Sequence, residues 1–78
     1  MQLMTADEPE ILPSMEEAMN DLRTKPIVSA WPTVAVLLGL SRGGVFEAAH
    51  RGDFETLRFG KLIKVPTAPL RRKLGIEA

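Results

Sequence analysis

The sequence is poor in the residues that most often form a reactive centre. It has no cysteine and a single histidine among its 78 residues. Without cysteine the chain has neither a disulfide nor a thiolate metal site, and one histidine, His50, does not make a metal cluster. It shows no nucleophile–base pair, phosphate-binding loop or set of metal ligands. These absences argue against an enzyme, and we expect no cofactor and no bound metal.

Long apolar runs are also absent. No stretch approaches the roughly 18 uninterrupted apolar residues of a membrane-spanning helix, and no charged-then-apolar signal peptide opens the chain. A chain of 78 residues has room for one small domain. We therefore expect a soluble cytoplasmic protein with no membrane partner.

The net charge is zero, but the charges are unevenly distributed. Residues 1–25 contain six acidic and two basic residues, a net charge of −4, whereas residues 26–78 contain eight basic and four acidic residues, a net charge of +4. Such an asymmetry suggests two parts with different functions. We divide the chain into an acidic arm with a short helix, residues 1–28, and a basic domain, residues 29–78.

The acidic part contains one predicted helix. Residues 1–13 have two prolines and no period, which indicates a loose arm. Ser14 and Glu17 have the spacing of a capping box, which predicts a helix over 14–23. Four apolar residues then recur at i, i+3, i+4 and i+7, namely Met15, Ala18, Met19 and Leu22. This apolar side either packs on the same domain or, through Met15, Met19 and Leu22, contacts a partner.

Two short helices are expected in the middle of the chain, after an extended linker or short strand over 27–30. Pro32 suits the first turn of one helix, which ends at Gly39. Ser41 is a good N-cap for the other helix, which covers about 42–51. A close pair of helices joined by a tight turn follows from these signals.

The two helices also carry the spacing that a close crossing requires. Ala35 is the small residue at the contact, Gly39 is free to adopt positive φ in the turn, and Val45 anchors the second helix. The apolar positions around them are filled by Val34, Leu38, Leu40 and Ala49. This spacing is typical of a DNA-binding helix-turn-helix.

Apolar and basic residues alternate over 57–65, and with a central glycine they predict a hairpin. A two-residue turn would pair Leu57 with Lys64, whereas a three-residue loop would pair Phe59 with Ile63. The second register keeps the apolar residues on one face, and because one buried face fixes register, we expect it here.

The chain closes with another predicted helix. Pro66 ends the second strand because it cannot donate to a ladder, and Thr67 is expected to cap the helix. Leu70 and Leu74 are expected to face inward, and Gly75 to end the helix. The order helix, tight turn, helix, hairpin, helix predicts an α+β fold, a small winged helix-turn-helix with an extra N-terminal helix.

Several short motifs follow one another in the second half of the chain. They are LGLS at 38–41 followed by Arg42, VF at 45–46, RG at 51–52, RFGK at 58–61 and KVP at 64–66. Their order and spacing resemble those of the small excisionase-type, MerR-like winged-helix DNA-binding domains, and the resemblance covers about residues 30–75.

The chain departs from this family at two places. The family has serine or threonine where Gly43 and Gly44 stand, so two hydroxyls that reach phosphate or base are missing. It also caps its first helix with threonine or serine and places glutamate three residues on. Those places hold Ala30 and Thr33, which leaves Ser29 as the candidate cap.

The resemblance implies binding to double-stranded DNA and two possible functions. One is that of a phage excisionase, or recombination directionality factor, which binds a row of sites, bends the DNA and directs an integrase towards prophage excision. The other is that of a small MerR-like transcription regulator, although regulators of that type add a coiled coil for which the chain has no room. We expect an excisionase at the nucleoid of a bacterial host, with the integrase and adjacent copies as partners of the acidic helix. A protein-interaction module without DNA binding is the remaining alternative.

The helix over 42–51 is expected to enter the major groove. If Val45 and Ala49 face the core, Gly43, Glu47 and Arg51 point outward. Arg51 then reaches phosphate or guanine, and Glu47 either accepts from cytosine or pairs with a neighbouring basic side chain. Glycines at a helix start let the backbone approach a phosphate closely; the alternative is a poorly formed first turn. The predicted DNA-binding residues of this segment are Ser41, Arg42, Gly43, Gly44, Glu47 and Arg51.

The hairpin is expected to act as the wing. Arg58, Lys61 and Lys64 are placed on it to enter the adjacent minor groove or to contact phosphates. The alternative is a charged edge that discourages pairing with other strands.

Overall fold

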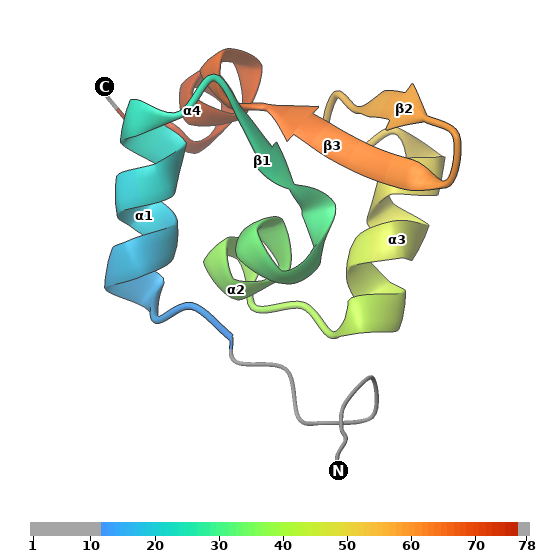
Figure 1. Cartoon of the computed structure of the whole chain (residues 1–78), viewed down its shortest axis with the longest axis horizontal. Helices are drawn as coiled ribbons and strands as arrows, with labels where there is room; N and C mark the ends of the chain where they lie inside the picture. The colour runs from blue at the N-terminus through green and yellow to red at the C-terminus, as the bar shows by residue number, and fades with distance from the viewer. Residues whose placement is uncertain (1–11, 77–78) are drawn as a thin grey trace, which may run out of the picture.

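The structure is a computed structural model that describes residues 12–76. The predicted loose arm falls mostly on residues 1–11, outside the described residues. Helices surround a small antiparallel sheet, with α1 and α3 at opposite ends of the molecule (Figure 1), so the expected α+β class is confirmed. The elements are α1 (Met15–Thr24), β1 (Ile27–Ser29), the helical turn η1 (Ala30–Val34), α2 (Ala35–Leu38), α3 (Arg42–Arg51), β2 (Leu57–Phe59), β3 (Leu62–Pro66) and α4 (Thr67–Leu74).

Helix α1 begins as its sequence predicts. The Ser14 hydroxyl accepts from the N–H of Glu17 at 3.0 Å, and the Glu17 carboxylate accepts from the N–H of Ser14 at 2.9 Å, which completes the capping box. Ala18 and Leu22 are fully buried, so the apolar side of α1 packs on the rest of the molecule. Leu22 is therefore unavailable to a partner, whereas Met15 is 51% exposed and Met19 is half-buried.

The sheet has the strand order β1-β3-β2 and is antiparallel throughout. Val28 of β1 lies opposite Val65 of β3, and both are buried, so this face of the sheet covers the core. Leu22 of α1 belongs to the same core cluster as Val45 of α3. The described residues therefore share one core across the boundary that we expected at residue 28.

The register of the hairpin differs from the expected one. Phe59 pairs with Leu62, and Leu57 pairs with Lys64, so the turn has two residues. Gly60 has a φ of 62°, and tight hairpin turns need such positive φ values. The three-residue loop was wrong because it assumed a buried face on β2 that fixes register, and every residue of β2 is exposed.

Helices α2 and α3 form the expected close pair. Ala35 and Val45 are buried, and Gly39 ends α2 in the left-handed conformation with a φ of 70°. The start of this segment differs from the expectation, because Ser29 makes no capping hydrogen bond with its side chain. Its hydroxyl instead accepts from Nζ of Lys64 at 3.1 Å, which links β1 to β3.

Thr67 connects α4 to the chain that follows α1. The N-cap position of α4 is held by Pro66, which makes no side-chain hydrogen bond, so the predicted threonine cap was wrong. Thr67 is buried, and its hydroxyl donates to the main-chain carbonyls of Lys25 and, at 3.0 Å, of Pro26. Its hydroxyl is therefore used for tertiary contact rather than for capping.

The rest of α4 follows its sequence except at Leu74. Leu70 is buried, as expected, but Leu74 is 37% exposed because it lines an open apolar cleft rather than the core. Gly75 ends the helix with a φ of 74°. The guanidinium of Arg71 donates to the carbonyl of Leu22 at 2.8 Å, so this cation stabilises the last turn of α1.

Candidate nucleic-acid interface

Helix α3 has one buried side and one exposed side. Val45, Ala48 and Ala49 face the core. The helical spacing predicted that Gly43, Glu47 and Arg51 point outward, and all are exposed. The exposed residues of this helix are Arg42, Gly43, Glu47, His50 and Arg51.

The start of α3 is capped and sterically open. The hydroxyl of Ser41 accepts from the N–H of Gly44 at 3.0 Å, as its N-cap role predicts. A Cβ added at Gly43 would meet no atom within 4 Å, whereas one added at Gly44 would lie 3.1 Å from the Ser41 oxygen. The two glycines therefore differ: Gly43 leaves room for a close ligand, and Gly44 leaves room for the cap.

Arg51 at the end of α3 is paired with an acid. Its Nη2 and Nε atoms donate to Oδ2 of Asp53 at 2.7 and 3.2 Å. The hydrogen bond and negative charge of Asp53 raise the pKa of Arg51, and the charge of Glu47 adds to the effect. Both side chains are largely exposed, and a guanidinium has five N–H donors, so Arg51 retains donors for a further acceptor. The sequence interpretation missed Asp53, although an acid just beyond the helix end is a visible signal.

The hairpin reaches α3 through Arg58. Its Nη2 atom lies 3.3 Å from Nδ1 of His50, and because a guanidinium only donates, the imidazole nitrogen is the acceptor. This contact between β2 and α3 joins the predicted wing to the predicted recognition helix. Sequence reasoning placed Arg58 on the wing but did not pair it with His50.

The other two predicted wing cations lie in different surroundings. Lys61 is exposed in the turn between β2 and β3. Lys64 is half-buried, and its ammonium donates to Ser29. Successive residues of a strand point to opposite faces, so Lys64 lies on the face opposite Val65 and the core. The structure therefore groups Arg58 with α3, and it separates Lys64 from them.

Arg42 in the first turn of α3 lies over the ring of Trp31, with its guanidinium carbon 5.9 Å from the ring centroid. A cation at this distance is attracted by the ring quadrupole. Trp31 is half-buried and packs against the core. The contact holds the Arg42 side chain beside the exposed start of α3.

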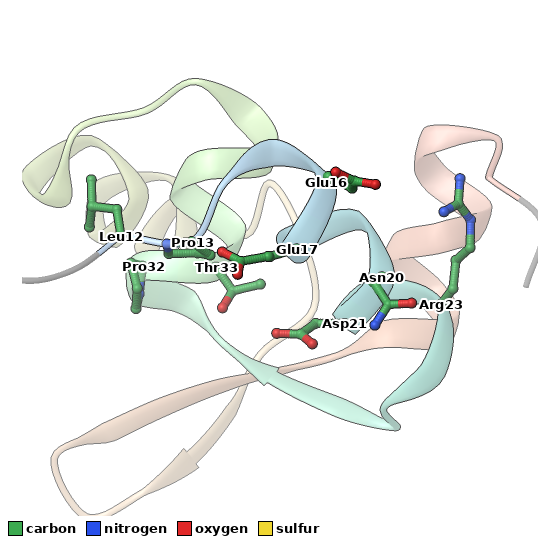
Figure 2. Close-up of a pocket in the computed structure, with 9 residues that line it drawn as sticks. All are labelled: Leu12, Pro13, Glu16, Glu17, Asn20, Asp21, Arg23, Pro32 and Thr33. Atoms are coloured by element: carbon green, nitrogen blue, oxygen red, sulfur yellow. The ribbon is translucent and has the colours of Figure 1, made fainter.

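A groove of about 660 Å³ lies along α1 and holds none of the predicted DNA-binding residues. Figure 2 shows three carboxylates beside it, those of Glu16, Glu17 and Asp21. Glu17 serves the capping box, and Asp21 pairs with Lys25 at 3.4 Å. Helix α1, which carries these carboxylates, lies at the other end of the molecule from α3 and the hairpin (Figure 1).

Other kinds of site find no support in the part of the chain that the structure describes. Residues 12–76 contain no group of three or more metal-ligating side chains. No helix formed by these residues is both long and apolar enough to cross a bilayer. Comparison with family models, curated proteins and solved structures finds no match to this chain.

Proposed function

We propose that the protein binds double-stranded DNA as a winged helix-turn-helix, with α3 in the major groove and the β2–β3 hairpin as the wing. The observation that carries this proposal is the contact of Arg58 with His50. It joins the hairpin to α3, so that both elements can face one duplex. Such a helix and an adjacent basic hairpin match the dimensions of neighbouring grooves.

The electrostatic arrangement supports the same proposal. Phosphates attract cations and the positive end of a helix dipole, and the exposed side of α3 has cations in its first and last turns. Gly43 leaves the start of α3 open to close approach. The cations of the proposed interface are Arg42, Arg51, Arg58 and Lys61.

A salt titration tests DNA binding. Each phosphate contact contributes roughly −0.9 to the slope of log K against log salt concentration, so four cations predict a slope of about −3 to −4. Gel-shift or fluorescence-anisotropy measurements between 50 and 200 mM salt on a labelled duplex will give this slope. A protein that binds no duplex, or binds with affinity independent of salt, would be the protein-interaction module instead.

We further propose that DNA binding serves recombination, as the resemblance to excisionase-type domains implies. A domain of this size has few base contacts, and adjacent copies on tandem sites supply additional specificity and bend the duplex. Met15 and the acidic residues of α1 are the proposed contact with an adjacent copy or with the integrase. Their position away from α3 leaves the DNA-binding surface unobstructed.

A reconstituted recombination reaction separates excisionase from transcription regulator. The reaction contains a phage integrase and a plasmid that carries the attachment sites of that integrase, with and without this protein. We expect excision products only when the protein is added with the integrase. A protein that binds DNA with the predicted salt slope but leaves excision unchanged would be the regulator.

A further inference from the structure

The tip of the β2–β3 hairpin exposes two large apolar side chains. Phe59 and Leu62 are directly opposite each other in the ladder, and they are 55% and 59% exposed. The two-residue turn between them places both at the extreme end of the hairpin. They form an apolar pair, the tip pair, on a hairpin whose charged residues are all basic.

The register separates this pair from the core. Phe59, Leu62 and Lys64 lie on one face of the hairpin, and Arg58 with Ile63 lies on the other. Ile63 packs against the core cluster, whereas neither member of the tip pair belongs to it. The exposure of Phe59 and Leu62 thus serves no packing purpose among the described residues.

Charge identifies the kind of ligand that this tip accepts. Residues 57–66 contain three cations, Arg58, Lys61 and Lys64, and no acid. Lys61 lies in the turn directly between Phe59 and Leu62. An apolar pair with a lysine beside it and no acid on the hairpin complements a duplex, where the bases lie between two rows of phosphates.

We propose that Phe59 and Leu62 form a wedge that enters the minor groove, partly unstacks one base step and bends the DNA. Apolar side chains inserted from the minor groove kink duplexes by roughly 20–90°. Lys61 then lies near the phosphates on either side of the step. This inference rests on the proposed function, because it gives the hairpin a role only when the protein binds duplex DNA.

The duplex for the test is one that the protein itself selects from a random-sequence pool. 2-Aminopurine is placed at the pyrimidine–purine steps within the part of the duplex that the bound protein covers in a footprinting experiment, since these steps unstack most easily. Its fluorescence rises when a base loses its stacking partner. End labels on the same duplex report the bend by energy transfer.

The double variant Phe59→Ala with Leu62→Ser is compared with Leu57→Ala as a matched control. Leu57 is on the same face of the same hairpin and 38% exposed, but it lies away from the tip. We expect the double variant to keep the wild-type salt slope and to lose the fluorescence rise and most of the bend. Leu57→Ala keeps all three signals, and thermal melting verifies that both variants are folded.

Two results would overturn the wedge while leaving DNA binding intact. In one, wild-type protein binds with the predicted salt slope but gives no fluorescence rise. In the other, the double variant unstacks and bends DNA as the wild type does, with self-association or integrase binding lost instead, which would assign the tip pair to a protein contact. Absence of salt-dependent binding by the wild type would instead reject the proposed function together with the wedge.

Discussion

The guanidinium of Arg58 in β2 meets the imidazole of His50 in α3 at 3.3 Å. The two residues are separated by the end of α3 and the connection to the hairpin, so the contact fixes one element relative to the other. A wing and a recognition helix must be held in such a relation to follow the surface of one duplex. Because of this contact, we expect the hairpin and α3 to bind DNA as one unit, so that a substitution on the hairpin also affects binding by α3.

Replacing Arg58 by alanine tests this relation. We expect Arg58→Ala to weaken duplex binding about tenfold and to make the salt slope less negative by about 1, as the loss of one phosphate contact requires. Gel-shift titration at several salt concentrations measures both values. The control is Arg23→Ala, which removes an equal charge from α1, at the end of the molecule away from α3 (Figure 1). Equal effects of the two variants would show that only net charge matters.

Gly43 provides a test of close backbone approach. A side chain here meets no protein atom within 4 Å, and replacing a helical glycine by alanine stabilises a helix by roughly 0.5–1 kcal/mol. We expect Gly43→Ala and Gly43→Leu to melt at or above the wild-type temperature, and Gly43→Leu to bind DNA at least tenfold more weakly. Wild-type affinity in Gly43→Leu would contradict close approach. Gly44 is less suitable, because a Cβ there crowds the Ser41 cap.

The sequence predicted best the features that depend on a few neighbouring residues. The capping box of Ser14 with Glu17, the cap at Ser41 and the ends of α2 and α4 are all set within one helical turn. Their hydrogen bonds satisfy helix-end groups that exist in any helix. The exposed side of α3 was also predictable, because its helical period fixes which residues accompany Val45.

Features that depend on distant parts of the chain were not predictable in the same way. The hairpin register was wrong because β2 has no buried side chain to set it. The hydroxyl of Thr67 reaches carbonyls 41 and 42 residues away, and Lys64 reaches Ser29. Each of these partners is brought close only by the pairing of β1 with β3, which no local pattern reveals.

Asp53 is expected to limit the affinity for DNA. Its carboxylate binds Nε and Nη2 of Arg51 and places a negative charge beside the proposed DNA-binding surface. We expect Asp53→Asn to bind duplex about three- to tenfold more tightly at 50 mM salt, with a smaller gain at 200 mM because salt screens exposed charges. Anisotropy titrations measure the gain. The control is Glu55→Gln, which removes an equal charge from the other exposed acid before β2. Equal gains in duplex affinity for the two variants would show that the pairing of Asp53 with Arg51 has no role.

Ser41 allows stability and DNA binding to be separated. Ser41→Ala removes the N-cap oxygen, which costs about 1 kcal/mol of unfolding free energy and lowers the melting temperature by about 4–8 °C for a domain of this size. Ser41→Asp keeps a capping oxygen but adds negative charge at the start of α3. We expect Ser41→Asp to melt near the wild type and to bind duplex at least tenfold more weakly. Wild-type affinity in this variant would place the phosphates elsewhere.

Thr67 is predicted to stabilise the fold without touching DNA. It is buried, and its hydroxyl donates to two carbonyls and accepts from Arg71 at 3.1 Å. Thr67→Val keeps the volume of the side chain but removes the hydroxyl partner of the Lys25 carbonyl, at a cost of about 1–3 kcal/mol; the Pro26 carbonyl still accepts from the N–H of residue 67. Thr67→Ser keeps the hydroxyl and loses one buried methyl group, at a cost of about 0.8 kcal/mol. Urea unfolding should therefore rank the wild type first, serine second and valine last, with equal duplex affinity for all three under conditions where each is folded. A valine variant as stable as the serine variant would show that the hydroxyl contributes nothing to holding α4 against the end of α1.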